Sequence, residues 1–195
     1  MADRDEPVAL PAGVELRAAA AIDRREIRSL WERRTGLGIS EVLDAVVDER
    51  TAAYGFVATK VETVLGFGVV IVVPEEDADD RLSVPLAAYP LGDEVAIFHA
   101  SAVREEWEGN GIGSALMRVR LRLAREAGVD SGIGTAWLRP HTVGSSALFE
   151  KFGFERVDTV PEFYASIDDR ECPDCGDPCE CSAGIYLWTP ADGAD

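Results

Sequence analysis

Lysine is almost absent from this 195-residue chain, in which Lys60 and Lys151 are the only two examples and every other basic residue is arginine. The 19 basic residues stand against 36 Asp and Glu, which gives a formal net charge of -17. A surface this acidic repels phosphate backbones and anionic lipids. We therefore expect no partner of the nucleic-acid class and no membrane surface.

Long apolar runs are also missing, because no segment approaches the ~20 residues that a membrane-spanning helix needs. The first residues, MADRDEPVALPAG, are acidic where a signal peptide would be basic and then apolar. These two observations predict a cytoplasmic protein. Aromatic residues make up only 8% of the chain, but 47% hydrophobic residues are enough for one core, so we expect a single domain over 1–195.

High acidity combined with so little lysine is typical of proteins that stay hydrated in molar salt. The composition therefore predicts a halophilic, haloarchaeal protein, and the alternative is an acidic mesophilic protein from a GC-rich genome.

The periodicity of the apolar residues changes along the chain between helical and strand patterns, with no internal repeat. It predicts a mixed α/β (α+β) domain. The expected strands are 14–17, 53–61, 63–73, 94–103, 133–138, 154–167 and 183–188, and the expected helices are 22–34, 40–51, 114–127 and 143–152.

A glycine cluster joins the strand that ends at Val103 to the helix that follows. Gly109, Gly111 and Gly113 leave backbone N–H groups exposed at a helix N-terminus, where the helix dipole favours a pyrophosphate even in an acidic protein. A tight structural turn is an equally good interpretation of the glycines alone. A Rossmann turn is disfavoured because no βαβ unit with an acidic residue about 20 positions later begins the chain here, and a P-loop is disfavoured because no Gly-Lys-Ser/Thr follows.

Residues 103–116 resemble the acyl-CoA binding motif of the GNAT superfamily of N-acetyltransferases, with the pattern falling on Glu108, Gly111 and Gly113. Residues 145–154 resemble a second signature of that family, a helix that leads to Gly-Phe and the next strand. The resemblance covers about residues 14–189. It implies the GNAT acyl-CoA N-acyltransferase fold, a mixed, mostly antiparallel twisted sheet flanked by helices.

The resemblance implies acetyl transfer from acetyl-CoA to a primary amine by direct attack, the acceptor being a small molecule, a lysine or a protein N-terminus. It also allows a homodimer. The residues that it implies for acetyl-CoA are Ser101, Ala102, Val103, Glu108, Gly109, Asn110, Gly111, Ile112, Gly113, Ser114, Ser145 and Phe149. The alternative from another class is a non-catalytic acyl-CoA sensor or a zinc-dependent interaction module.

Three positions depart from the family pattern. Glu108 replaces an Arg or Gln, so its carboxylate needs solvent, salt or a nearby arginine to screen it from the pyrophosphate. Thr142 stands where an Asn is common, and Phe149 stands where many members have a tyrosine that protonates the thiolate. Water suffices for a thiol leaving group with a pKa of about 8.5, so we expect slower rather than abolished transfer.

His99 is the candidate catalytic base. Strand alternation would place Ile97, His99, Ser101 and Val103 on one face, and an imidazole with a pKa near 6.5 suits proton removal at neutral pH. Some members of the family have a histidine base four residues before the same valine. The alternative is a structural histidine in the sheet, and His141 has a weaker claim.

Four arginines follow the glycine cluster in the expected helix. They are predicted to be mostly surface partners for acids, with Arg118 able to reach a CoA phosphate. They are Arg118, Arg120, Arg122 and Arg125.

All four cysteines lie in the stretch CPDCGDPCEC, as Cys172, Cys175, Cys179 and Cys181. Cys-Pro-x-Cys-Gly is typical of a zinc knuckle, and four thiolates complete a tetrahedral structural Zn²⁺ site with no open position for catalysis. Disulfides, a redox pair or free thiols are the alternatives. We expect the knuckle to be an insertion over 170–182 between the last two strands, where the resemblance suggests that it borders the acceptor groove.

Overall fold

A computed structural model describes residues 9–36, 53–78, 84, 86–139, 144–165, 172–176 and 178–190. Their contacts divide the chain into two units. The first contains the residues up to Val69 and Ala100–Leu121, and the second contains Val70–His99 and the residues from Arg122.

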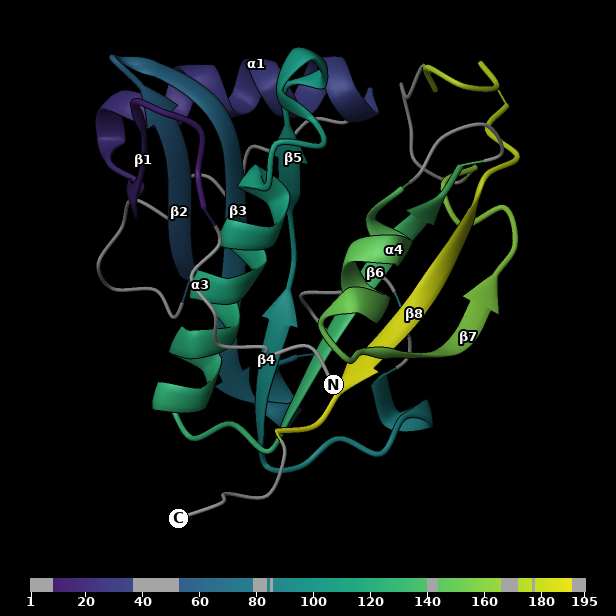
Figure 1. The fold of residues 1–195 in the computed structure, drawn as a ribbon. Helices are drawn as coiled ribbons and strands as arrows, with labels where there is room; N and C mark the ends of the chain where they lie inside the picture. Colours follow the sequence, from purple (N-terminus) through teal and green to yellow (C-terminus); the bar gives the residue numbers. More distant parts are fainter. Residues whose placement is uncertain are drawn as a thin grey trace. The chain divides into compact units, whose positions relative to one another are not determined.

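Two antiparallel pairings organise the first unit. β1 pairs with β2 from Val14↔Lys60 to Ala18↔Phe56, and β5 pairs with the beginning of β3 from Gly66↔Val103 to Gly68↔Ser101. Figure 1 shows β1 and β2 side by side. The elements are β1 (Val14–Ala18), α1 (Arg24–Thr35), β2 (Ala53–Lys60), β3 (Thr63–Pro74), β5 (Ser101–Val103) and α3 (Ile112–Glu126), of which β3 and α3 extend into the second unit.

The boundaries of α1 follow from its flanking residues. Asp23 precedes its first residue, and Gly36 ends it in the left-handed region (φ 67°), donating its N–H to the Glu32 carbonyl. Ile27 and Leu30 are buried as expected from the periodicity. Ile22, the first residue of the helix expected over 22–34, is 85% exposed because it lies in the 3-10 turn η1 (Ala21–Asp23) before the helix.

α3 carries a large apolar face with Ile112 and Leu116 packed against Leu65 of β3. The prediction that its arginines are surface residues is wrong for Arg120, which is only 2% exposed. The Arg120 guanidinium donates to the Val69 and Leu116 carbonyls, and burial lowers its pKa to about 10. Gly68 makes the space, since a Cβ there would lie 2.9 Å from Arg120 Nε.

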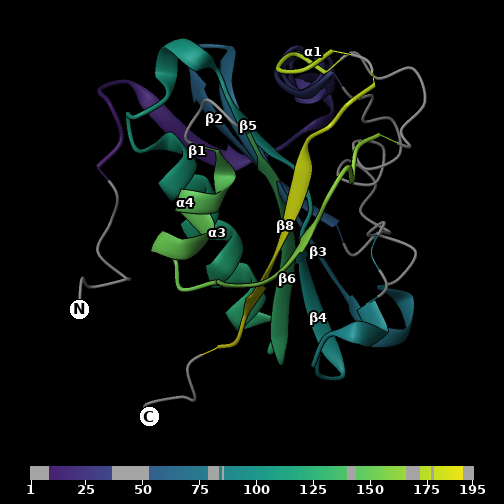
Figure 2. The ribbon, with the colours of Figure 1, turned by 90° about the vertical axis from the view of Figure 1, so that its right-hand side faces the viewer.

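The second unit is built from strands of both directions. β6 runs parallel to β4 and antiparallel to β8, and β8 pairs antiparallel with β7. Figure 2 shows β8 beside β6. The elements are the end of β3, β4 (Glu94–Phe98), β6 (Ser131–Leu138), α4 (Ser145–Lys151), β7 (Glu155–Val160) and β8 (Ser182–Trp188).

The strand order is β1-β2-β3-β4-β6-β8-β7, with β5 added to β3. Within the described residues, this makes an eight-stranded sheet in which β4 and β6 are parallel, whereas β1 with β2, β3 with β4 and β5, and β8 with β6 and β7 are antiparallel. The predicted mixed, mostly antiparallel sheet with helices is confirmed.

The strand expected over 94–103 is interrupted. Gly68 faces Ser101, but Ile71 faces Ile97, so two residues of β3 stand opposite Phe98, His99 and Ala100. The extra residue is a β-bulge, and the Ala100 carbonyl still accepts the Val69 N–H at 2.7 Å. The alternation that would place Ile97, His99, Ser101 and Val103 on one face is therefore wrong, because a bulge reverses the phase of a strand.

Some expectations fall on residues outside the described part. These are the helix at 40–51, His141 and Thr142. Among the described helices, none is long and apolar enough to cross a membrane.

Candidate functional site

The turn between β5 and α3 has the backbone conformation that its glycines suggest. After η5 (Glu105–Trp107), Gly109 and Gly111 adopt left-handed φ values of 73° and 82°. Residues with a Cβ rarely adopt this conformation, so glycine is the residue of choice at both positions. Asn110 lies between them, and its side-chain amide donates to the Glu108 carbonyl at 3.0 Å.

α3 begins two residues earlier than predicted, at Ile112 rather than Ser114. Its first helical hydrogen bond runs from the Ala115 N–H to the Gly111 carbonyl. The N–H groups of Ile112 and Gly113 precede that bond, and such groups at a helix start are suited to hold an anion. The side chains of Ile112 and Ser114 are buried. Gly109 is exposed, and a Cβ added at this residue would point into open space.

The carboxylate of Glu108 has a cationic partner that sequence reasoning missed. Arg34, the penultimate residue of α1, donates from Nη2 to Glu108 Oε1, and its Nη1 lies 3.6 Å from Glu105 Oε2. The Arg34 side chain is 23% exposed. An arginine from a different element therefore lies beside Glu108. No local signal reveals it, since 74 residues separate the pair.

β5 presents its three residues, Ser101, Ala102 and Val103, half-buried. One edge of β5 pairs with β3. The Ser101 hydroxyl also donates a hydrogen bond to the Phe67 carbonyl of β3 at 3.0 Å. The next residue, Arg104, ties the end of the strand to its surroundings by donating to the Val64 carbonyl at 2.6 Å and to Glu26 at 3.3 Å. These contacts hold the backbone of β5 in a fixed position ahead of the glycine turn.

Of the remaining residues predicted for acetyl-CoA chemistry, His99, Ser145 and Phe149 lie in the second unit and Arg118 lies in the first. His99 is in the bulge after β4, half-buried, with its Nδ1 buried. Ser145 is exposed at the first position of α4. In α3, Arg118 has two buried guanidinium nitrogens, Nε and Nη1.

Phe149 is buried in the second unit and is stacked on Tyr186 of β8, with ring centroids 5.1 Å apart. It also lies against β6, where a Cβ on Gly134 would come within 2.7 Å of its ring. The Tyr186 hydroxyl donates to Glu150 at 3.0 Å, and burial raises its pKa. The phenol nearest to Phe149 in this stack is thus protonated and paired with a carboxylate.

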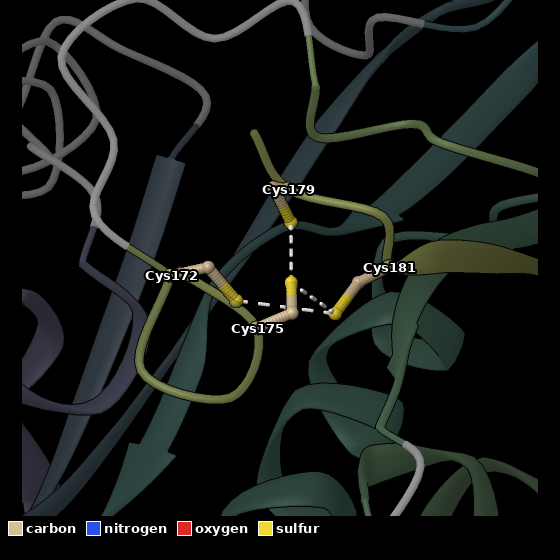
Figure 3. A group of neighbouring side chains, drawn as sticks. All are labelled: Cys172, Cys175, Cys179 and Cys181. Atoms are coloured by element: carbon tan, nitrogen blue, oxygen red, sulfur yellow. Dashed lines mark hydrogen bonds between the residues drawn. The ribbon is translucent and has the colours of Figure 1, made fainter. Parts of the chain in front are cut away.

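The four cysteines converge between β7 and β8, as Figure 3 shows. All four Sγ atoms lie within 4.8 Å of one another, and all four thiols are free of disulfides. Cys175 Sγ is 3.7 Å from Cys179 and 3.6 Å from Cys181, and Cys172 is 3.9 Å from Cys181. Cys175 is exposed and the other three are buried.

The thiols differ in pKa because their surroundings differ. Burial opposes ionisation of Cys172, but N–H groups of Asp174 and Cys175 and the neighbouring thiols lower its pKa to about 7. Burial raises the pKa of Cys181 to about 12, and the nearby Trp137 side chain acts in the opposite direction. One low and one high value are typical of thiols that share protons at close range.

Residues 24–154 match the model of the acetyltransferase (GNAT) family. This chain belongs to that family. The match covers most of the chain, including the glycine turn, α4 and Phe154, and it ends before the cysteines. No curated protein matches the chain.

Solved structures of acetyltransferases share the fold at low identity. NAA60 from Arabidopsis thaliana in complex with a bisubstrate analogue superposes with a TM-score of 0.69 at 14% identity, covering 90% of this chain and 97% of that one. The same protein in complex with acetyl-CoA superposes with a TM-score of 0.67 at 14% identity, covering 91% of this chain and 99% of that one. The ribosomal-protein-S18-alanine N-acetyltransferase of Escherichia coli superposes with a TM-score of 0.62 at 17% identity, covering 93% of this chain and 97% of that one.

Proposed function

We propose that this GNAT family member is an acetyl-CoA-dependent N-acetyltransferase that acts on a primary amine. The observation that carries the proposal is the turn between β5 and α3, in which left-handed Gly109 and Gly111 lead into the Ile112 and Gly113 amides at the start of a helix. These amides hold a pyrophosphate without a net basic surface. Structural relatives with the same fold have been solved with acetyl-CoA, which supports this cosubstrate.

Arg34 supplies the positive charge that the family motif carries on its own first residue. Glu105 and Glu108 hold the guanidinium beside the glycine turn, where its single positive charge offsets one of the two carboxylates. The negative charge that Glu108 brings to the motif is therefore compensated by an arginine from another element. β5 offers backbone groups of Ser101 and Val103 to the pantetheine arm.

Transfer then needs the amine to lose a proton, the N–C bond to form and the C–S bond to break. His99 is the proposed base, acting directly or through one water molecule, since an imidazole accepts a proton near neutral pH. The leaving thiolate takes its proton from water, because Phe149 has no hydroxyl and the Tyr186 hydroxyl is bound to Glu150. This makes thiolate protonation less assisted than in a member with a tyrosine at position 149.

The acceptor classes to be tested are small amines, lysine side chains and protein N-termini. One structural relative is an N-acetyltransferase for alanine of ribosomal protein S18. For this reason the acceptor panel should contain peptides with a free N-terminal alanine as well as polyamines and lysine peptides. The same panel separates an enzyme from an acyl-CoA sensor, which would bind acetyl-CoA and acetylate nothing.

The experiment measures free CoA and acetylated amine by mass spectrometry, because thiol reagents would also react with the four cysteines. Gly111→Ala and Gly128→Ala form a matched pair, since both glycines have left-handed φ values, 82° and 72°. Both substitutions introduce strain of about 1 kcal/mol. We expect the KM for acetyl-CoA to rise at least about fivefold only for Gly111→Ala, a change equivalent to about 1 kcal/mol. Equal effects of both variants, or binding without turnover on every amine, would contradict the proposal.

A further inference from the structure

We propose that Cys172, Cys175, Cys179 and Cys181 bind one Zn²⁺ through four thiolates, and that this site fixes the C-terminal end of β6 through Trp137 and Arg139. The inference is independent of acetyl transfer. It rests on the geometry of the sulfurs, on the N–H groups around them, and on contacts that connect the loop to β6.

The spacing of the sulfurs fits a tetrahedral ion. Four thiolates at the usual Zn–S distance of about 2.3 Å have their sulfurs about 3.8 Å apart. The three measured S···S distances are 3.6, 3.7 and 3.9 Å, and no pair exceeds 4.8 Å. Sulfurs at these distances surround a space of the size of one ion.

The backbone of the loop is arranged as a metal knuckle. Gly176, at a left-handed φ of 76°, donates its N–H to the Cys172 carbonyl at 2.9 Å and closes a tight turn between the first two cysteines. N–H groups of Asp174 and Cys175 point at the Cys172 sulfur, and the Glu180 N–H lies 3.4 Å from the Cys175 sulfur. Such N–H···S bonds disperse the negative charge of metal-bound thiolates.

The donor set selects the metal. Four thiolates in tetrahedral geometry are typical of zinc or an iron centre, whereas magnesium and calcium require oxygen ligands. Among these, zinc needs no redox partner and suits a site whose four protein ligands leave no open position. Three of the four cysteines lie in an apolar cluster with Tyr164 and Ala183, as expected for a site that supports structure.

Two residues at the end of β6 are held by this loop. Trp137 packs against the cluster that contains Cys172, Cys179 and Cys181. Arg139 stacks on the Trp137 ring at 4.5 Å and makes a bidentate ion pair with Asp174, at 2.6 and 2.5 Å. The pair is sheltered, with side-chain exposures of 15% for Arg139 and 14% for Asp174. Because Asp174 lies between Cys172 and Cys175, an ion that fixes these two thiolates also restricts the Asp174 carboxylate that Arg139 contacts.

The first test is the metal content of the full chain purified without chelators. We expect about one zinc per chain, released stoichiometrically when a mercurial reagent titrates the thiols of the intact protein. Cys175→Ser should lose most of the zinc, whereas Glu180→Gln should keep it, because Glu180 contributes only its backbone N–H. Iron in place of zinc, a disulfide, or less than about half an equivalent of zinc would overturn the four-thiolate zinc site.

The second test measures amide hydrogen exchange of peptides covering 131–139 in the wild type before and after removal of zinc. We expect faster exchange after removal, and an intermediate rate in zinc-loaded Asp174→Asn, which keeps all four thiols but weakens the ion pair. This comparison needs no cysteine variant, so it remains valid if Cys175→Ser does not fold. Unchanged exchange on removal of zinc would refute the connection between the metal and β6.

Discussion

Exchanging Glu108 for glutamine tests the assignment of Arg34 as the arginine of the CoA site. Glu108→Gln removes one negative charge from the turn and leaves a side chain of the same length, whose amide oxygen can still accept from Arg34. Because the proposed ligand group is an anionic pyrophosphate, removing this negative charge reduces repulsion, and we expect the KM for acetyl-CoA to fall. Arg34→Gln should raise it.

The magnitude follows from the exposure of the pair. Glu108 is 49% exposed and Arg34 is 23% exposed, so solvent screens both charges considerably. A unit charge about 4 Å from another in water contributes about 1 kcal/mol. We therefore expect about a fivefold fall in KM for Glu108→Gln and a rise of similar size for Arg34→Gln, at the lowest ionic strength at which the protein stays folded.

The assay is the initial rate of CoA release as a function of acetyl-CoA concentration, at low salt and at 1 M salt. Glu106→Gln is the matched control, since it removes an equal charge from the same exposed turn. At 1 M salt the Debye length is about 3 Å, so both effects should shrink. The reasoning is refuted if Glu108→Gln raises the KM, or if Glu106→Gln lowers it equally.

Three further predictions concern other parts of the chain. Asp23 is held ionised by Arg17, whose hydrogen bonds keep the pKa of the carboxyl below its ordinary value of 3.8. The stabilising effect of the ionised Asp23 carboxylate is therefore complete at neutral pH and is lost as the pH falls through that lowered pKa. Asp23→Asn should lower the free energy of unfolding, measured by urea titration, by about 1–2 kcal/mol at pH 7. The decrease should be smaller in acid. Val61 is 91% exposed and adopts a left-handed φ of 57°, so Val61→Gly should raise stability by about 1 kcal/mol, and an unchanged Tm would contradict this. His99→Ala should flatten the pH–rate profile between about pH 6 and 8; an unaltered profile would remove His99 from the mechanism.

The features that the sequence could predict are those with local chemical causes. Gly109 and Gly111 predict a turn because few other residues adopt the left-handed backbone conformation that this turn requires. The spacing of the cysteines predicts that their sulfur atoms converge, because short loops keep the four side chains close together. The periodicity likewise predicted the strand regions, although β4 and β5 were expected as one strand and β7 is shorter than expected, ending at Val160.

The features that the sequence could not predict depend on partners distant in the chain. The bulge at His99 is defined only against β3, since a one-residue offset in register has no signature in β4 itself. Burial of Arg120 depends on the space at Gly68, 52 residues earlier by numbering, on a different element. Arg34 pairs with Glu108 only because the end of α1 lies beside the glycine turn.

Some of the acidic residues have a structural role, because their carboxylates bind and orient arginine side chains. Arg17, Arg34 and Arg139 are each fixed by a carboxylate, and two of these pairs are bidentate. The planar guanidinium makes two parallel hydrogen bonds to a carboxylate, which the lysine ammonium cannot do. A chain rich in carboxylates therefore gains directional contacts from arginine that lysine would not give. At Arg34 this arrangement places a cation beside the glycine turn proposed to hold a pyrophosphate, so that the charge of Glu108 is offset where an anionic cosubstrate would bind.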